Sequence, residues 1–543
     1  MNVGQRILRA SLVVMLAHVI FKFAGLVQFK ALGHYCDPVT LDLFIFSFVG
    51  VLWTFYLIGE EGLGPAFLPV FMEAFDKKSE RDAWRFASSV ITVQVLVIAV
   101  VVSLVAAFPE TVVRLFSDWD DPEALAAYMQ RAPRMVRGMI PALFGLSVGS
   151  TTYLVLNGYK RFFLAAFGDS VVKFAIIAGV LASVATGGSL TDCLIAGVLV
   201  GGFAKVATHL LGLRRELWQL RPNLNLRTRA WRRFAFLVAP LLLGILFGKV
   251  RDVFNNIWVL SHTHEAGLVA YNEFGRKIFN AIGYLVPYSV SIAMYPFFCE
   301  LVDREERGEM ARLVTRSGQI LWVLVVPVTA LVVALSLPLA RLIFQGGQFD
   351  LEAARLAATA NACYTLVLPF FTLEYVFMQT FFSHRRMVTP IVLGLVFSTL
   401  SMVLSWLGVV AYGLTGAAAV AAVALAYALS RTLKTVSLGV LLRRFLPDLD
   451  GAHAGSFALR MAAAGLATGG AAYLARKGCE AVTDVYAGQT VAEVAAAVVP
   501  CLASGSVAGG AVYLAALRVL CPAEWREAVR WIRARLAARR AGR

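Results

Sequence analysis

The sequence predicts an all-α polytopic membrane protein with about fourteen transmembrane helices. Of the 543 residues, 59% are hydrophobic and 15% are charged, and the mean hydropathy is +0.72. A soluble domain has about a quarter charged residues. Apolar runs of about 18 residues or more recur along the chain, and each is long enough to cross the roughly 30 Å hydrocarbon core of a bilayer as a helix.

The predicted helices follow one another at short intervals. The first begins in MNVGQRILRASLVVML, which resembles a signal peptide. Because no small-residue cleavage site follows it, we expect it to be retained as a transmembrane helix. The fourteen helices are predicted at residues 11–32, 41–72, 86–108, 135–157, 162–185, 190–213, 235–260, 270–299, 318–344, 354–382, 388–410, 414–442, 456–475 and 490–519.

The loops between these helices alternate in charge, which predicts their orientation in the membrane. Acidic or weakly charged loops lie at 119–124, 261–265 and 346–350. Basic loops are cytoplasmic by the positive-inside rule, so an even number of helices places both termini in the cytoplasm. The basic loops lie at 77–85, 159–161, 214–233, 384–386 and 441–444. This distribution also explains the net charge of +16 without a nucleic-acid partner.

An internal repeat predicts the domain organisation. PVFME at 69–73 resembles PFFCE at 296–300, and Lys160-Arg161 resembles Arg385-Arg386, at offsets of 227 and 225 residues. Two six-helix lobes related in this way are typical of transporters that bind their substrate between the lobes. The predicted parts are an N-lobe at 1–213, a basic cytoplasmic linker at 214–234, a C-lobe at 235–445, two further helices at 446–520 and a basic tail at 521–543. The tail is either an amphipathic helix on the anionic inner leaflet or a solvated basic segment.

GEEGLGPAFLPVF, at 59–71, places two carboxylates in an otherwise apolar region. A helix over 41–75 would be roughly 50 Å long, so we expect a bend or break at Gly59, Gly62, Gly64 and Pro65. Non-helical backbone and charges inside a membrane face protein or water. We therefore predict that Glu60 and Glu61 line an internal aqueous cavity. The alternative is that they are solvated at the cytoplasmic end of the helix.

Further charges lie within the predicted helices. Helices 1, 2, 7 and 8 hold equivalent places in the two lobes, so their charges are predicted to meet in one central cavity. Cations there suit an anionic substrate, since Arg and Lys are the usual partners of phosphate. The alternative for each cation is that its side chain extends to the interface. The candidate residues besides Glu60 and Glu61 are His18, Lys22, Asp42, Lys249, Arg251, Asp252, Arg276, Lys277 and Glu374.

Other motifs carry little chemistry. Asp169 and Lys173 are spaced to neutralise each other on one helix. His262, His264 and Glu265 resemble a metal site only weakly, because side chains so close together in a short loop are usually solvated. The seven cysteines show no CxxC spacing, and there is no GxxxxGK[ST] nucleotide-binding loop. The sequence therefore predicts no catalytic residues, no metal site and no cofactor.

Five segments together resemble a known family. They are EGLGPAFLPVF (61–71), LNGYKRF (156–162), APLLLGILFGKV (239–250), LIFQGGQFD (342–350) and FFSHRRMVTP (381–390). The chain resembles the MurJ/MviN lipid II flippases, of the superfamily that includes the MATE multidrug exporters. The resemblance implies two MATE-like lobes, alternating access and transport of an undecaprenyl-pyrophosphate-linked muropeptide across the bacterial cytoplasmic membrane. It further implies membrane lipids and cell-wall synthesis proteins as partners.

The resemblance is weaker at the substrate-contacting residues. The family has an arginine and an Arg-Asp pair in helix 1, where this chain has His18, Ala24 and Gly25. It has arginines before the E-G turn, where this chain has Phe55 and Tyr56. The helix 8 arginine corresponds to Arg276 or Lys277, and Asp42 and a turn glutamate are kept.

Because of these departures, three alternatives to lipid II transport stay open. The first is a flippase for another lipid-linked oligosaccharide, of the exopolysaccharide or O-antigen type. The second is an ion-coupled multidrug exporter of the MATE type, which would require acids to dominate the cavity. The third is a transport-inactive scaffold for envelope assembly. A membrane enzyme is disfavoured because no catalytic constellation is present.

Overall fold

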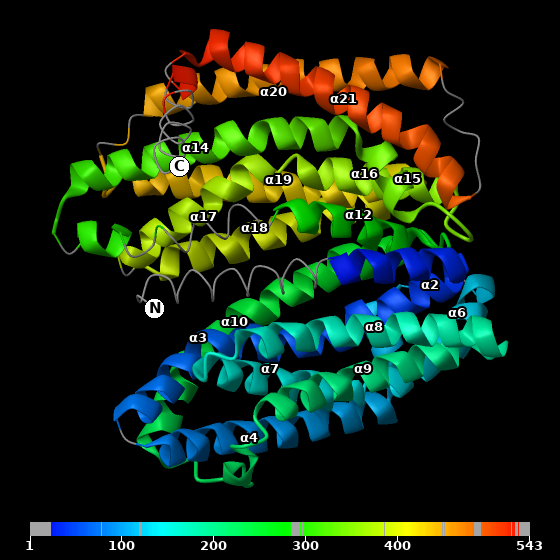
Figure 1. Cartoon of the computed structure of the whole chain (residues 1–543), viewed down its shortest axis with the longest axis vertical. Helices are drawn as coiled ribbons and strands as arrows, with labels where there is room; N and C mark the ends of the chain where they lie inside the picture. The colour runs from blue at the N-terminus through cyan, green and yellow to red at the C-terminus, as the bar shows by residue number, and fades with distance from the viewer. Residues whose placement is uncertain are drawn as a thin grey trace, which may run out of the picture. The chain divides into compact units, whose positions relative to one another are not determined.

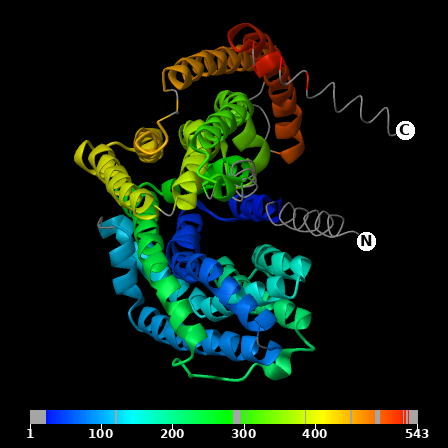
Figure 2. The same ribbon diagram turned by 90° about the vertical axis from the view of Figure 1, so that its left-hand side faces the viewer.

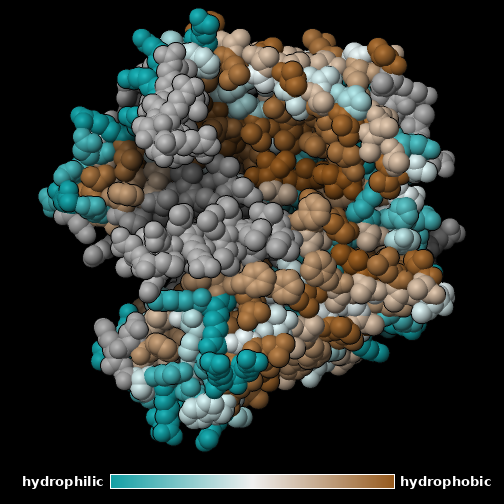
Figure 3. All heavy atoms as spheres, in the orientation of Figure 1, coloured by the Kyte–Doolittle hydropathy of each residue, from teal (hydrophilic) through white to brown (hydrophobic). Residues whose placement is uncertain are grey.

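The computed structural model describes residues 23–77, 79–118, 122–283, 294, 297–302, 304–384, 386–447, 449, 451–482, 490–522, 524–526 and 530. This part of the chain is built from helices and contains no β-strand, which confirms the predicted all-α class. Apolar side chains cover the middle of the helices, and polar side chains gather toward their ends (Figure 3). This distribution is that of helices embedded in a bilayer.

The number of membrane crossings is only partly determined. Nine described helices are long and apolar enough to cross a membrane, or up to eleven if each of two bent pairs counts as one span. Parts of the predicted helices 11–32 and 270–299 lie outside the described residues, as does most of the predicted tail. The number fourteen therefore stays a prediction.

Contacts divide the chain into two compact units. Unit 1 comprises Met1–Glu273 and Ser405–Ala419, and unit 2 comprises Phe274–Leu404 and Val420–Arg543. Residues 235–273, predicted to begin the C-lobe, group with unit 1, where α10 (Arg229–Val253) packs along α3 (Trp53–Lys77). The predicted limits of the two lobes stay predictions.

Unit 1 is an α-helical bundle in which α7, α8 and α9 pack against one another (Figures 1 and 2). One apolar cluster of this unit gathers aliphatic and aromatic side chains from α3, α4, α7 and α10, among them Phe67, Trp84 and Phe234. Besides α3 and α10, its elements are α2 (Pro38–Phe44), η1 (Ile45–Leu52), α4 (Glu80–Ala107), α5 (Pro109–Phe116), α6 (Pro122–Met139), α7 (Ala142–Gly158), α8 (Phe162–Thr186), α9 (Leu190–Gly212), η2 (Leu217–Gln219), η3 (Phe254–Trp258), α11 (Val259–Ser261), η4 (Leu407–Ala411) and the start of α12 (Leu268–Gly283).

The predicted break in the second helix is not found, and the alternative of a bend stays a prediction. Backbone through Gly59, Gly62, Gly64 and Pro65 is helical, and α3 runs without interruption from Trp53 to Lys77. An interrupted helix would leave backbone N–H and C=O groups unsatisfied in hydrocarbon, which is costlier than glycine or proline inside a helix. The irregularity lies earlier, in the π-helix η1.

Two further π-helices lie near it in unit 1. A Cβ atom on Gly50 of η1 would lie 2.3 Å from Cδ1 of Ile257 in η3, so these two segments are in direct contact. The third, η4, contacts α11. Because π-helical segments often mark functional sites, the proximity of three of them makes this part of unit 1 a candidate for a functional region.

The predicted linker packs against α4. Asn223 donates from its backbone to Thr92 Oγ1 at 3.1 Å and from its side-chain amide to Ser89 Oγ at 2.8 Å. The linker therefore lies along α4, and these contacts explain why a transmembrane helix carries a row of hydroxyl side chains. A second contact of the linker is an ion pair at 2.6 Å between Glu216 and Arg161, which lies in the turn before α8. The hydrogen bonds to Glu216 raise the pKa of the Arg161 guanidinium.

Unit 2 contains a bent span and a helical pair. The predicted helix 354–382 is two helices that meet at a 42° bend just before Pro369, which has no N–H for the helical ladder. The pair α20 and α21 packs together and on α14 (Figure 1). The elements are α14 (Arg307–Ala334), α15 (Ser336–Phe344), α16 (Leu351–Thr365), α17 (Leu368–Ser383), α18 (Val388–Trp406), α19 (Gly416–Leu442), α20 (Gly451–Val482) and α21 (Val491–Leu520), with the remainder of α12.

A close approach of two helix backbones in unit 1 gives a stability prediction. A Cβ on Gly145 of α7 would lie 2.3 Å from the Gly202 carbonyl oxygen of α9, a backbone atom that cannot rotate away. We expect Gly145→Ala to destabilise the protein by about 1–3 kcal/mol, measured as a lower midpoint of thermal unfolding in detergent. Gly244→Ala is the matched control, since a Cβ there meets nothing within 4 Å. Equal midpoints for the two variants would contradict the predicted packing.

Candidate functional site

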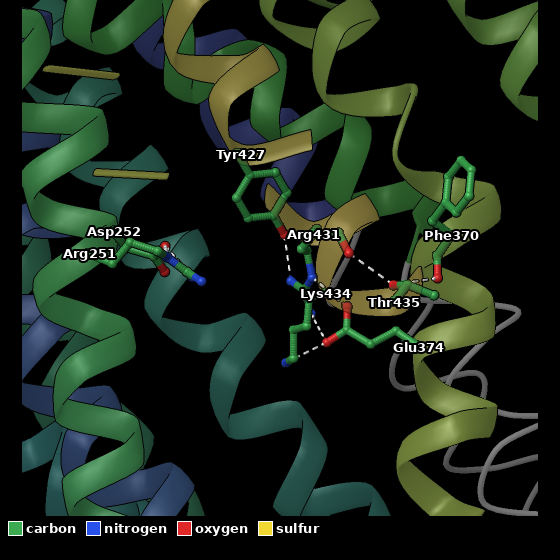
Figure 4. A network of polar contacts seen from close by, with 8 residues as sticks. All are labelled: Arg251, Asp252, Phe370, Glu374, Tyr427, Arg431, Lys434 and Thr435. Atoms are coloured by element: carbon green, nitrogen blue, oxygen red, sulfur yellow. Dashed lines mark hydrogen bonds and ion pairs between the residues drawn. The ribbon is translucent and has the colours of Figure 1, made fainter. Parts of the chain in front are cut away.

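A buried carboxylate in unit 2 holds two cations. Glu374 of α17 is 1% exposed, and its oxygens accept from Arg431 Nε at 2.8 Å and from Lys434 Nζ at 2.8 Å. Figure 4 shows both α19 side chains directed at Glu374. Two cations and one carboxylate leave the triad with a formal charge of +1. A net positive charge of this kind attracts an anionic group.

Aromatic rings position the triad. The Arg431 guanidinium lies 4.4 Å from the centre of the Phe371 ring and donates to the Tyr427 hydroxyl at 2.6 Å. Tyr427 contacts the Tyr364 ring edge-to-face, at 5.4 Å between ring centres. The Arg276 guanidinium of α12 lies 5.9 Å from the Tyr364 ring centre. Arg276 and the triad therefore belong to one connected cationic and aromatic group, which we call the unit 2 cationic cluster.

The structure gives Glu374 two cationic partners. The sequence interpretation placed Glu374 on a cavity wall, and that placement stays a prediction. Sequence reasoning missed Arg431 and Lys434, although their spacing in the apolar run 414–442 was the signal. Of the predicted helix 8 cations, Arg276 joins the cluster, and Lys277 lies next to it, partly exposed.

In unit 1, the predicted charges of α10 lie just before a π-helix. Arg251 Nη2 lies 2.6 Å from Asp252 Oδ1, and Figure 4 shows the two neighbouring side chains folded onto each other. Lys249 is partly exposed. The buried amide of Asn272 donates to Asn256 at 3.1 Å, which ties η3 to α12. Charges, amides and an irregular helix are thus brought together on one stretch of α10 and η3.

Asp42 is a helix cap. Its carboxylate is 1% exposed and accepts from the backbone N–H groups of Gly267 and Ala270, at 2.6 and 2.8 Å. Tyr128 donates a third hydrogen bond at 3.1 Å. An anion is stabilised at the N-terminus of a helix, here α12, by the unpaired N–H groups and the helix dipole. Asp42 therefore caps α12 and contacts Tyr128 in this structure, and its predicted place on a cavity wall stays a prediction.

Gly267 is required for this cap. Its φ of +87° lies in the left-handed region, and a Cβ there would lie 2.5 Å from the Tyr271 ring. A side chain would therefore both strain the turn and collide with α12.

Loops predicted to share one side of the membrane meet in unit 1. Asp118 accepts from His262 Nδ1 at 2.6 Å, and its backbone N–H donates to Ser261 at 2.7 Å. Glu265 accepts from the backbone N–H of Gly416 at 3.0 Å. His262 and Glu265 are thus engaged in loop contacts, and no group of three potential metal ligands occurs among the described residues.

Glu60 lies beside an ion pair that sequence reasoning missed. The Lys205 ammonium lies 2.6 Å from Asp169 and donates to the Tyr56 hydroxyl at 2.7 Å, and the Glu60 carboxylate hydrogen-bonds Tyr56. The sequence interpretation paired Asp169 with Lys173, whereas the structure pairs Asp169 with Lys205. A lysine inside the apolar run 190–213 was the available signal.

The remaining candidates cannot be placed. His18 and Lys22 lie outside the described residues. The same holds for the side chain of Glu61 and the surroundings of Gly59, Gly62 and Pro65.

Comparison with solved structures establishes the fold. The chain superposes with a TM-score of 0.71 on "Lipid II flippase MurJ, inward closed conformation", at 18% identity, over 95% of this chain and 100% of that one. It superposes with a TM-score of 0.65 on an inward-facing multidrug resistance MATE family transporter of the MOP superfamily, at 13% identity, over 79% and 95% of the two chains. The predicted MATE-like architecture is confirmed.

Sequence comparison points to one family. A probable lipid II flippase MurJ of Borreliella burgdorferi is 23% identical over 411 residues, which cover 75% of this chain and 79% of the relative. One from Rhizobium meliloti is 26% identical over 352 residues, or 62% and 63% of the two chains. The family model described as lipid II flippase MurJ matches residues 36–484. Because this match spans most of the sequence, the chain belongs to the MurJ lipid II flippase family.

Proposed function

We propose that this multi-pass membrane protein is a transporter that moves lipid II, the undecaprenyl-pyrophosphate-linked peptidoglycan precursor, across the bacterial cytoplasmic membrane. The family match over residues 36–484 carries the proposal. The unit 2 cationic cluster supports it, because a pyrophosphate needs cationic partners on its path. Alternating access, both termini in the cytoplasm and contact with cell-wall synthesis proteins belong to the same proposal.

The cationic and the acidic residues have different roles in the proposed transport. Arg276, Arg431 and Lys434 attract the pyrophosphate, because guanidinium and ammonium groups form strong charge-assisted hydrogen bonds with phosphate oxygens. Further cations contribute along the path, namely His18, Lys22, Lys249, Arg251 and Lys277. The acids serve as counter-ions or gate partners, and these are Asp42, Glu60, Glu61, Asp252 and Glu374.

A flippase for another lipid-linked oligosaccharide is the second candidate. The observation that favours it is Tyr56, which stands where the family resemblance implies an arginine and is instead a buried partner of Lys205. A head-group contact of the family is therefore absent from α3. A MATE-type exporter of cationic drugs fits less well, since the Glu374 triad is net positive.

Native mass spectrometry of the purified protein tests the function. We expect a polyprenyl pyrophosphate that bears a muropeptide to travel with the protein. A polyprenyl lipid bearing another sugar would select the second candidate. Only bulk phospholipids, in every detergent and at every growth stage, would contradict both flippase proposals.

Arg276 provides a test of the cationic cluster. We expect Arg276→Ala to weaken lipid II binding by about tenfold, the effect of losing one hydrogen bond to a charged group, with little change in thermal stability. The measurement is lipid II titration of protein in nanodiscs. Arg355→Ala on α16 is the control, because Arg355 is more than half exposed and its described ion pair, with Glu352, lies within its own helix. Equal affinities of both variants would remove Arg276 from the site.

For Glu374 we expect a substitution to lower stability and not to weaken lipid II binding, the reverse of Arg276. Glu374→Gln leaves two cations beside a neutral amide in a buried position, which costs about 3–5 kcal/mol. We expect a large fall in the midpoint of thermal unfolding and no weakening of lipid II binding by the folded fraction. Glu352→Gln, an exposed glutamate of unit 2, should unfold like wild type. A variant as stable as wild type that no longer binds lipid II would show that Glu374 contacts the substrate instead.

A further inference from the structure

The linker between α9 and α10 presents a strongly basic surface. Residues 214–233 include seven arginines and a single acid, Glu216, whose ion pair is with Arg161. Arg233 pairs with Glu73 of α3. The other six arginines of the linker are all exposed, and they are Arg214, Arg215, Arg221, Arg227, Arg229 and Arg232.

Hydrogen bonds place the linker along the first half of α4 (Figures 1 and 2). Gln219 donates to Glu80, the first residue of α4, at 3.1 Å. Further along, the backbone N–H of Asn223 donates to Thr92, also at 3.1 Å. Because a helix rises 1.5 Å per residue, these two contacts lie about 18 Å apart along α4.

The length of α4 gives the depth of these contacts in the membrane. Its 28 residues extend over about 42 Å, roughly 12 Å more than the hydrocarbon core. The polar residues lie at its start, Glu80–Arg85, whereas Leu96, Val97 and Val100 are more than half exposed further along. The surplus of about eight residues therefore lies at the start of α4. Ser88 and Thr92 then mark the level where head groups give way to acyl chains.

The turn of the linker lies at this level. Arg221 donates from its backbone to Ser88 Oγ at 3.3 Å, and Arg227 follows six residues later. Between these arginines, the side chains of Leu224 and Leu226 are 59% and 39% exposed. Exposed leucines flanked by arginines are typical of segments that bind an anionic membrane surface.

Local contacts hold the linker in this conformation. The side-chain oxygens of Asn223 and Asn225 accept from the backbone N–H groups of Asn225 and Arg227, at 3.0 and 3.3 Å. Leu217 and Leu220 pack against the apolar cluster of unit 1 that contains Trp84. The inward-facing side chains thus anchor the linker on unit 1, and the arginines and Leu224 are left on its outer surface.

We propose that Arg221 and Arg227 bind the phosphate groups of anionic phospholipids in the cytoplasmic leaflet, with Leu224 and Leu226 inserted between the head groups. Guanidinium groups form charge-assisted, bidentate hydrogen bonds with phosphate oxygens. The excess of arginines selects lipids with a net negative charge, and the positive-inside rule assigns the linker to the cytoplasmic side. Binding fixes the start of α10 at the membrane surface, because α10 begins at Arg229. No residue of the unit 2 cationic cluster takes part.

Hydrogen exchange of the linker amides, followed by mass spectrometry of the full chain in nanodiscs, tests this site. Nanodiscs of phosphatidylcholine alone are compared with nanodiscs that also contain phosphatidylglycerol. We expect residues 221–229 to exchange about 25-fold more slowly with phosphatidylglycerol, since each of two arginines near an anionic surface contributes a factor of about five. High salt should reduce this difference. Equal exchange of the wild-type linker in both nanodiscs would overturn the proposal.

A double variant tests the two arginines. Arg221→Gln/Arg227→Gln should lose the slower exchange in phosphatidylglycerol. The matched control is Arg304→Gln/Arg312→Gln, which removes two arginines that are 61% and 78% exposed and that each pair with a glutamate three or four residues away. The control should respond to phosphatidylglycerol like wild type. A full response of the linker double variant would contradict the assignment.

Two further measurements separate the remaining outcomes. Leu224→Ser/Leu226→Ser keeps every arginine and should show a smaller slowing than wild type, and it replaces the arginine variant if that variant does not fold. A slowing equal to wild type would overturn the insertion of the leucines. Inorganic phosphate added to phosphatidylcholine nanodiscs should have no effect, and an equal slowing would reveal a site for free anions instead. Because no lipid II is present, the result is independent of the proposed transport.

Discussion

The structure depends on one constraint, which is that hydrocarbon satisfies no polar group. Backbone and charged side chains must find their partners within the protein. Three of the described buried charges obey it through contacts with other helices. Asp42 is paired with the N-terminus of α12, Glu374 with two cations of α19, and Lys205 with Asp169. Each of these contacts joins elements that are distant in sequence, so the same interactions that solvate the charges also fix the packing.

The constraint also explains the irregular features. A π-helix re-aims side chains while it keeps most backbone hydrogen bonds, which is why the deviations at η1 and η3 are helical and the expected break at Gly59–Pro65 is not found. Glycines act in the same way, since Gly149 and Gly168 remove a Cβ where a long basic side chain must cross between helices. Irregular backbone and missing side chains thus create room for charge at little cost in backbone hydrogen bonding.

Much of the architecture could be predicted because it depends on local pattern. Apolar runs predicted the helices, and loop charge assigned 119–124 and 261–265 to one side of the membrane. Asp118, just before the first of these loops, contacts His262 in the second. Ion-pair partners could not be predicted, since they depend on which helix faces lie together. Asp169 stands four residues from Lys173, yet its described ion pair is with Lys205 of α9, 36 residues later in the chain. The capping role of Asp42 could not be predicted for the same reason. Its partners are backbone N–H groups at the start of α12, and the sequence does not show which helix N-terminus lies beside Asp42.

In the unit 2 cationic cluster, pairing with a carboxylate is compatible with attraction of an anionic substrate. An isolated guanidinium in hydrocarbon would be prohibitively costly, so Arg431 and Lys434 need Glu374 when no substrate is present. One carboxylate for two cations holds both side chains in place and leaves a formal charge of +1, which an arriving pyrophosphate can neutralise. With two carboxylates the group would be neutral and would not attract the head group, and with none it would be unstable. On the proposed function, the single buried glutamate therefore sets the balance between stability and substrate attraction.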